Sequence, residues 1–222
     1  MILVLENEVD LSERYLVDEI VSYLPEYDVY DYAKKGAEHQ PDVSNYDGVI
    51  VGGSTAGVYE EDEYPWMSQQ KKLIRELVEK EIPTLGICFG HQIINSALGG
   101  EVVNSGKRRA HLVRAELIND PLFEDVEPVV PILHSDIVTQ KGKGMEVIGK
   151  TDYYPYFATR HRDAPLWTVQ YHPEFTLRVK HLGGGWEENE LSFEDSTATN
   201  TLRNFYSIST GNKLDNRVEA GD

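Results

Sequence analysis

The chain has 222 residues, of which 21 are Lys or Arg and 38 are Asp or Glu, so its formal net charge is −17 at pH 7. This length suits one sizeable α/β domain, and 40% hydrophobic residues favour a packed core over a disordered chain. The acidity argues against nucleic-acid binding, because neutralising phosphates requires clustered Lys and Arg. The one short basic run, 107–109, is interpreted as a solvated edge, with a partner contact as the alternative.

The apolar runs are short, and none approaches the roughly 20 residues that span a bilayer, so no membrane segment is expected. The first six residues lack a basic leader and suit a buried strand rather than a signal peptide. A single cysteine, Cys88, excludes an internal disulfide framework and favours a cytoplasmic location. That cysteine is either an inert core residue or a nucleophile.

Short apolar runs alternate with amphipathic stretches in the first half of the chain, which predicts parallel strands joined by helices. The strands are expected at 2–5, 27–32, 48–51 and 83–87. The helices are expected at 11–24, 65–78 and 90–98. The predicted fold class is therefore α/β, with a mostly parallel sheet flanked by helices.

Beyond residue 100 the pattern becomes strand-like, which predicts an antiparallel extension of the sheet. These shorter strands are expected at 102–103, 112–117, 129–133, 145–148, 157–159 and 167–171, before a closing helix at 202–206. We expect a single domain over 1–210. Within it, residues 181–200 form an acidic, Gly-rich insertion, either a mobile lid or a plain solvated loop. Residues 211–222 are expected to be a flexible polar tail.

Cys88 lies in the sequence Gly86-Ile87-Cys88-Phe89-Gly90, where the fourth predicted strand turns into a helix. Glycines two residues to either side allow the sharp, strained turn that presents the nucleophile of serine hydrolases in their G-x-S-x-G motif. The start of a helix also favours a thiolate over a thiol. On this motif alone, a tight turn around a buried, inert cysteine is an equal alternative.

A candidate base follows the last predicted strand. Pro173 ends the hydrogen bonding of that strand, and Glu174 can reach back to one nitrogen of His172 and orient its ring. The other nitrogen would then face the thiol and activate it. A structural histidine beside an unrelated Glu is the alternative, but its conjunction with the cysteine turn favours a catalytic pair.

The strand at 48–51 ends in a glycine turn, Gly52-Gly53-Ser54, which can aim backbone N–H groups into a site. We expect the N–H groups of Gly53 and Phe89 to form an oxyanion hole. One such donor is worth about 10²–10³ in rate in a hydrolase. Without the cysteine turn and the His172–Glu174 segment, an ordinary strand-to-loop turn would be the favoured interpretation.

These stretches, in this order, resemble the motifs of the class I, triad-type glutamine amidotransferases. The matching motifs are the Gly52-Gly53 turn, the G-x-C-x-G-H-Q sequence at 86–92 and the V-Q-x-H-P-E segment at 169–174. The resemblance extends from residue 1 to about residue 178 and is closest to the amidotransferase part of GMP synthase. It implies the flavodoxin-like fold of that family.

The resemblance also implies a role for each site residue. Cys88 would be the nucleophile, His172 the general base and acid, and Glu174 the carboxylate that orients the histidine. The residues implied to contact the substrate, L-glutamine, are Gly52, Gln92, His134, Ser135 and Asp136. The last three would contribute chiefly their backbone, which would hold the α-amino and α-carboxylate groups. Neither a metal nor an organic cofactor is expected.

Three positions depart from the family pattern. Ser54 stands where Pro is usual, Ser135 stands where Gly is usual, and residues 107–109 are basic where many relatives have an acidic residue followed by Gly. Residues 183–200 have no counterpart in the family pattern.

The predicted function is hydrolysis of glutamine to glutamate and ammonia through a cysteinyl thioester. The ammonia would pass to a separate synthetase subunit, because 222 residues leave no room for an acceptor reaction. A stand-alone γ-glutamyl peptide or amide hydrolase is the main alternative, although His91-Gln92 favours the amidotransferase. A catalytically silent regulatory subunit is a third possibility, against which the retention of Cys88, His172 and Glu174 argues.

Overall fold

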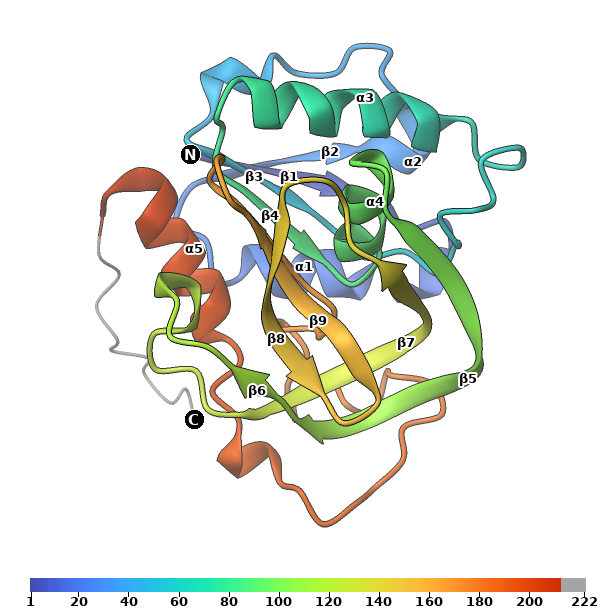
Figure 1. Ribbon diagram of the computed structural model, residues 1–222, viewed down its shortest axis with the longest axis vertical. Helices are drawn as coiled ribbons and strands as arrows, with labels where there is room; N and C mark the ends of the chain where they lie inside the picture. The colour runs from blue at the N-terminus through green and yellow to red at the C-terminus, as the bar shows by residue number, and fades with distance from the viewer. Residues whose placement is uncertain (213–222) are drawn as a thin grey trace.

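The computed structural model describes residues 1–212 and has a central eight-stranded sheet in the order β2-β1-β3-β4-β10-β9-β8-β6 (Figure 1). The first five strands in that order run parallel: β2 (Tyr27–Asp31), β1 (Ile2–Glu6), β3 (Gly48–Val51), β4 (Thr84–Ile87) and β10 (Leu166–Val169). The other three pair antiparallel: β9 (Tyr154–His161), β8 (Met145–Thr151) and β6 (Glu116–Leu117). The predicted α/β fold, with a parallel sheet and an antiparallel extension, is confirmed.

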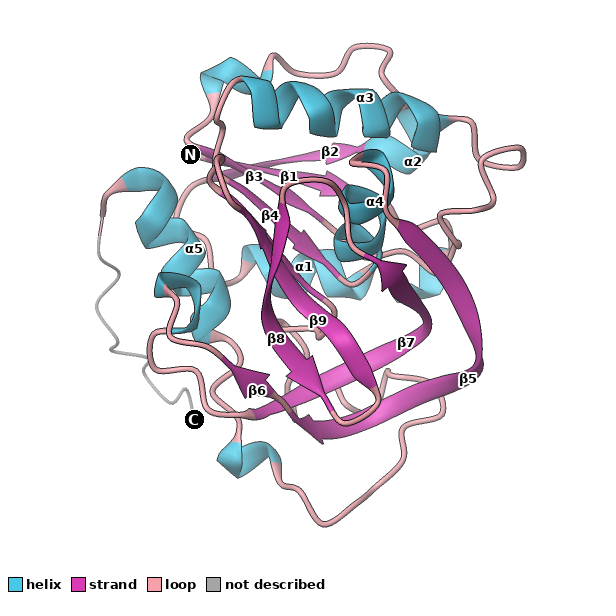
Figure 2. Ribbon diagram, viewed as in Figure 1, coloured by secondary structure: helices cyan, strands magenta, loops and turns pink. Residues whose placement is uncertain are grey.

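Helices lie on both sides of the parallel strands (Figure 2). They are α1 (Tyr15–Val21), α2 (Tyr32–Lys35), α3 (Trp66–Glu79), α4 (Phe89–Ala97) and α5 (Asn200–Thr210). Because alternate residues of a strand point to opposite faces, Leu3 and Leu5 pack into one core with α3 and α4, while Ile2 and Val4 pack into another with α1 and α5. None of the helices within residues 1–212 is long and apolar enough to cross a membrane.

The helix predicted over 11–24 begins later and ends earlier than expected. A 3₁₀ turn (Leu11–Glu13) precedes it, because the Asp10 carboxylate accepts a hydrogen bond from the Ser12 N–H at 2.9 Å and closes a local turn. Helix α1 therefore starts only at Tyr15. Within residues 1–212, three further 3₁₀ turns lie at Val43–Asn45, Pro121–Phe123 and Phe193–Asp195.

A second sheet pairs two long antiparallel strands, β5 (Glu101–Arg114) and β7 (Val129–Gln140). The sequence predicts only short strands here, because polar residues interrupt the apolar runs. In Figure 1 the two strands lie across the end of the parallel sheet at which β1, β3 and β4 finish. The segment 134–136, implied to contact substrate, therefore lies within a strand rather than in a loop.

A bulge interrupts β5, where the register with β7 shifts between Asn104 and Arg109. Gly106 adopts φ +70°, and its N–H donates to Asn104 Oδ1 at 2.8 Å. A side chain rarely tolerates this backbone conformation, which explains the glycine. Because of the bulge, residues 105–108 do not pair with β7. Their side chains therefore need not alternate between the two faces of the sheet.

Residues 181–200 lie against the edge of β5. The Glu187 N–H donates to the Ala110 carbonyl at 2.7 Å, and Trp186 stacks on Phe175 and Phe193 with ring centroids 5.0 and 5.4 Å apart. Neither sequence interpretation of this segment, a lid or a plain loop, includes these contacts. The closing helix is longer than predicted and begins at Asn200. Of the expected tail, 213–222 lie outside the described residues.

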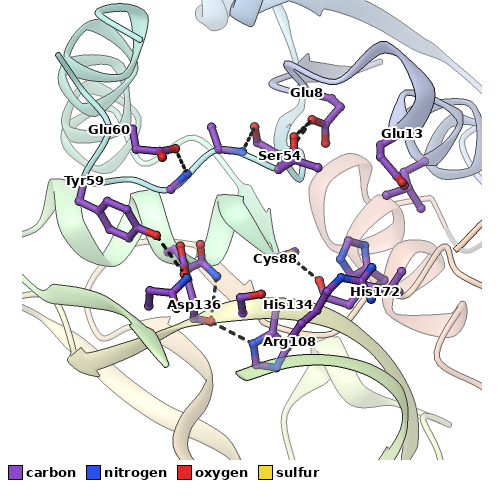
Figure 3. A pocket seen from close by; sticks show the side chains of 18 residues that line it. Glu8, Glu13, Ser54, Tyr59, Glu60, Cys88, Arg108, His134, Asp136 and His172 are labelled. Atoms are coloured by element: carbon purple, nitrogen blue, oxygen red, sulfur yellow. Dashed lines mark hydrogen bonds between the residues drawn. The ribbon is translucent and has the colours of Figure 1, made fainter. Parts of the chain in front are cut away.

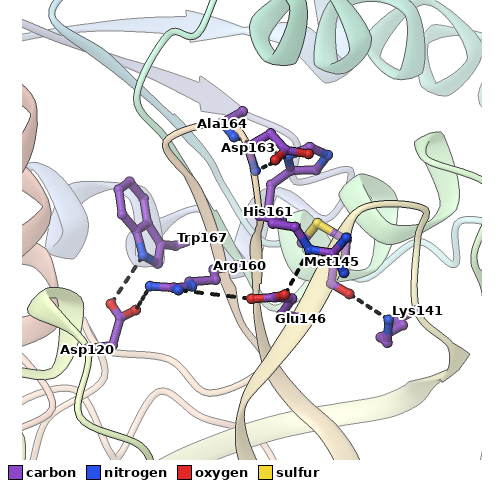
Figure 4. A network of polar contacts seen from close by, with 10 residues as sticks. Asp120, Lys141, Met145, Glu146, Arg160, His161, Asp163, Ala164 and Trp167 are labelled. Carbon is purple, nitrogen blue, oxygen red and sulfur yellow. Dashed lines mark hydrogen bonds and ion pairs between the residues drawn. The ribbon is translucent and has the colours of Figure 1, made fainter.

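A network of charged side chains ties the antiparallel strands together (Figure 4). Asp120 accepts hydrogen bonds from Arg160 Nη1 at 3.0 Å and from Trp167 Nε1 at 3.2 Å. Glu146 accepts one from Arg162 Nε at 2.9 Å. The Asp120 side chain is fully buried, so these partners compensate for the water that its carboxylate has lost.

A buried histidine connects α4 to the sheet. The Val138 N–H donates to the Tyr154 hydroxyl at 2.7 Å, and that hydroxyl lies 2.8 Å from His91 Nε2. His91 Nδ1 lies 2.7 Å from Thr168 Oγ1, so both ring nitrogens have a partner. Burial lowers the pKa of His91 to about 3, which keeps the ring neutral.

We expect the free energy of unfolding to fall as the pH drops below about 6.5, where histidines of the unfolded chain bind protons. Burial lowers the pKa of His134 to about 4, and that of His91 to about 3. Between each of these folded-state values and about pH 6.5, the unfolded chain binds more protons than the folded chain. Each such histidine therefore lowers the free energy of unfolding by about 1.4 kcal/mol for every pH unit of acidification. The free energy of unfolding, measured by urea titrations across this pH range, should change less steeply with pH for His134→Gln than for the original chain. Equal slopes would contradict the assignment of a buried, neutral His134.

Candidate active site

Cys88 lies between β4 and α4 in a strained backbone conformation, with φ +53° and ψ −104°. The flanking glycines make this turn possible. A Cβ at Gly90 would lie 2.0 Å from the Val51 carbonyl oxygen, and one at Gly86 would lie 2.6 Å from that of Gly90. The turn thus has the geometry that presents a nucleophile at the start of a helix.

Gly90→Ala is expected to destabilise the fold by about 3 kcal/mol, the upper range for inserting a methyl group into a packed site. The contact atom is backbone, which cannot move aside as a flexible side chain can. Gly184→Ala is the matched control, because a Cβ there would meet nothing within 4 Å. Urea denaturation of both variants measures the difference. Equal stability of the two would contradict the close packing of the turn.

His172 and Glu174 form a buried pair. His172 Nδ1 lies 2.7 Å from Glu174 Oε1, and the two side chains are 3% and 1% exposed. Because a carboxylate only accepts, Nδ1 carries the proton. The His172 N–H donates to the Pro131 carbonyl at 2.9 Å and fixes the segment that follows β10. The other ring nitrogen, Nε2, is buried and has no hydrogen-bond partner within residues 1–212.

The charge of His172 depends on its two neighbours. Burial by itself lowers the pKa of this imidazole, but the negative charges of Cys88 and Glu174 outweigh burial and raise the pKa well above its usual range. His172 is therefore favoured in its charged imidazolium form. A positive charge beside the sulfur is what a nucleophilic cysteine requires.

The glycine turn after β3 lies directly beside this pair. A Cβ at Gly53 would lie 3.5 Å from His172 Cε1 and 3.9 Å from Cys88 Cβ, and one at Gly52 would lie 2.9 Å from the Leu5 carbonyl oxygen. Phe89 is the first residue of α4, so its N–H has no acceptor within the helix. The structure brings together the backbone segments expected to form the oxyanion hole.

A cavity of about 440 Å³ opens in front of Cys88 and His172, as Figure 3 shows. Predicted site residues that line it are Cys88, Gln92, His134, Ser135, Asp136 and His172. The Glu174 side chain is buried behind the histidine, and Gly52, Gly53 and Phe89 are not among the lining residues. Glutamine fits in a space of this size.

The segment on β7 contributes both backbone and side chains. Asp136 Oδ1 accepts hydrogen bonds from Asn104 Nδ2 at 2.8 Å and from the Tyr59 hydroxyl at 3.2 Å. Burial raises the pKa of Asp136. His134 Nδ1 lies 2.9 Å from the Asp136 carbonyl oxygen, and its Nε2 lies 2.9 Å from the Tyr153 hydroxyl. His134 therefore shapes the wall of the cavity as a neutral ring.

Several lining residues were not predicted from the sequence, among them Glu8, Glu13, Tyr59, Glu60, Asn104 and Arg108. Figure 3 shows Arg108 at the rim on the side of His172 and Glu13. The β5 bulge explains its position, and Arg108 is also exposed to solvent, as the sequence interpretation of a solvated edge requires. These residues come from segments far apart in the chain, so no local motif could have identified them.

The fold and this site together define a class of protein. The family model for glutamine amidotransferase class-I matches residues 5–182, so the chain belongs to that family. It is similar to GMP synthase (glutamine-hydrolyzing) of Thermosipho africanus, with 37% identity over 130 residues, which are 58% of this chain and 24% of that protein. The corresponding enzyme of Aquifex aeolicus is 36% identical over 135 residues, 60% of this chain and 25% of that protein. The match thus spans about a quarter of the length of these relatives.

Two solved structures share the fold. A glutamine amidotransferase from Thermotoga maritima superposes with a TM-score of 0.73 at 21% identity, over 94% of this chain and 96% of that one. A glutamine amidotransferase from Methylobacillus flagellatus gives a TM-score of 0.71 at 17% identity, over 100% and 98% of the two chains. The fold is that of class I glutamine amidotransferases.

Proposed function

We propose that the chain hydrolyses the side-chain amide of L-glutamine to glutamate and ammonia. The observation that carries the proposal is the placement of Cys88, at a strained turn, beside a His172 that Glu174 orients at 2.7 Å. Family membership supports the choice of glutamine as substrate. In this proposal the ring nitrogen without a partner, Nε2 of His172, is the one that exchanges protons with the thiol and the substrate.

In the first half-reaction, the Cys88 thiolate attacks the amide carbon of glutamine. The N–H groups of Gly53 and Phe89 stabilise the oxyanion of the tetrahedral intermediate. The His172 imidazolium donates its proton to the leaving nitrogen, which departs as ammonia, and a γ-glutamyl thioester remains.

In the second half-reaction, neutral His172 takes a proton from water, and the resulting hydroxide attacks the thioester carbon. Collapse of this second intermediate breaks the carbon–sulfur bond, releases glutamate and restores the thiolate–imidazolium pair. The sum is glutamine plus water to glutamate plus ammonia, and the scheme uses neither a metal nor an organic cofactor. The proposed substrate contacts are Gly52, Gln92, His134, Ser135 and Asp136.

We further propose that the ammonia passes to a separate synthetase partner, and that the reaction takes place in the cytoplasm, where a lone thiol stays reduced. The match covers about a quarter of the length of GMP synthases (glutamine-hydrolyzing). This partial match supports an acceptor reaction that takes place on another polypeptide segment. Glutamate release by the purified chain, measured with and without candidate synthetases, tests this proposal. Release from glutamine supports it, whereas cleavage only of larger γ-glutamyl amides would replace it with a γ-glutamyl hydrolase.

A further inference from the structure

The proposed scheme assigns no role to Gln170, which directly follows β10 and lies two residues before His172. Its side chain is fully buried, and its Nε2 lies 3.5 Å from Cys88 Sγ, within hydrogen-bond distance for sulfur. The Gln170 N–H donates to the Phe157 carbonyl at 2.9 Å and anchors the residue to β9. A buried amide is thus held against the sulfur atom that is proposed to react.

The orientation of this amide follows from a chain of hydrogen bonds. Gln92 Nε2 lies 3.2 Å from the Asp136 carbonyl oxygen, which can only accept, so this atom of Gln92 is the NH₂ group. The same NH₂ group lies 3.2 Å from Gln170 Oε1, so the atom of Gln170 that faces it must be the oxygen. The NH₂ group of Gln170 therefore points at Cys88. The backbone at residue 136 fixes the orientation of both amides.

The sulfur has a second contact, and the two contacts favour different protonation states. Cys88 Sγ lies 3.5 Å from the Leu133 carbonyl oxygen, to which a thiol can donate. A thiolate has no proton to donate, and that carbonyl dipole then faces a negative charge. The Gln170 NH₂ group can only donate, so it stabilises the thiolate more than the thiol.

We propose that Gln170 is a further catalytic residue, whose amide N–H groups stabilise the Cys88 thiolate while its amide oxygen holds Gln92 in place. The inference rests on the proposed function, since it takes Cys88 as the nucleophile. It adds to His172 a second, uncharged group that acts on the sulfur. Through Gln92, the same amide also links the nucleophile to a residue proposed to contact glutamine.

The test measures the sulfur directly and needs no substrate. Iodoacetamide reacts with thiolates, and Cys88 is the chain's single cysteine, so the alkylation rate against pH reports on this residue alone. Gln170→Leu has a similar shape but no donor. Loss of a hydrogen bond to a charged group should slow alkylation about tenfold on the acidic side and move the midpoint of the profile upward by about one pH unit.

Two further variants keep the test decisive. Gln170→Asn retains a polar amide, for the case that Leu is not tolerated, but is one methylene too short to reach the sulfur, so we expect the same shift. Thr168→Val removes a buried hydroxyl two residues away, bonded to His91 rather than to Cys88, and should leave the alkylation profile in place. Thermal melts verify that each variant is folded.

An unchanged alkylation profile in folded Gln170→Leu or Gln170→Asn would overturn the inference, as would an equal shift in Thr168→Val. Glutamate release is measured separately on the same samples. A chain that releases no glutamate but shows the Gln170-dependent shift would refute the proposed function and leave the role of Gln170 at the sulfur standing. Normal glutamate release without the shift would refute the role of Gln170 and leave the proposed function standing.

Discussion

Cys88→Ala should reduce glutamate release from glutamine on the order of 10⁴- to 10⁶-fold, the range seen when a hydrolase loses its nucleophile. Without the sulfur no thioester can form, and only direct attack by water remains. The change removes one buried atom, so the fold should persist. Glutamate release and a thermal melt of the same sample separate lost chemistry from lost structure.

Two matched variants sharpen the test of Cys88. Cys88→Ser keeps the size of the side chain but replaces the thiol with a much weaker nucleophile at neutral pH, and should be almost as inactive. Ser96→Ala alters the same helix at a position that does not line the cavity and should leave activity unchanged. Activity of Cys88→Ala within tenfold of the original chain would refute the nucleophile assignment.

Glu174→Gln is expected to lower glutamate release by about 10²- to 10⁴-fold, the range for replacing a triad carboxylate with its amide. The variant preserves size and a hydrogen-bonding oxygen but removes the negative charge 2.7 Å from Nδ1 of His172. Because that charge helps to raise the pKa of His172, the substitution should lower it. At a given pH, less of the imidazolium would then be available to protonate the leaving ammonia.

The pKa of His172 can be followed directly through the NMR shift of its Cε1 proton. In the original chain the ring should stay charged above pH 6.5, the ordinary histidine value, and in Glu174→Gln it should lose its proton at lower pH. Glu187→Gln, on the exposed segment beside β5, is the control and should leave this titration in place. Identical titrations in all three proteins would show that Glu174 does not set the charge of His172.

The parallel half of the fold could be predicted from the sequence because most of its strands, such as Ile2–Glu6 and Gly48–Val51, are short apolar runs. The helix over 11–24 was predicted too long, since apolar spacing does not reveal that Asp10 closes a separate turn. The strands β5 and β7 were predicted as fragments for a different reason. Some of their polar residues, among them Asn104 and Asp136, line a cavity, and the alternation of apolar and polar residues breaks there.

The residues of the site also differ in whether the sequence alone could indicate them. Cys88, His172 and Glu174 lie within short motifs, so local sequence could indicate them. Glu13, Tyr59 and Arg108 reach the cavity from three segments far apart in the chain, and for Arg108 the β5 bulge decides its direction. Gln170 stands inside a quoted motif, but its contact with Cys88 depends on how β10 lies beside β4. Such contacts follow from tertiary structure and leave no local pattern.

The central claim, that Cys88 attacks the side-chain carbon of bound glutamine, is most directly tested by covalent trapping. A diazoketone analogue of glutamine places an electrophilic carbon where the amide would lie. Mass spectrometry of the intact and digested protein should show one label per chain on the peptide of Cys88, slowed by excess glutamine and absent from Cys88→Ala. Labelling that persists in Cys88→Ala, or that glutamine does not slow, would contradict the account.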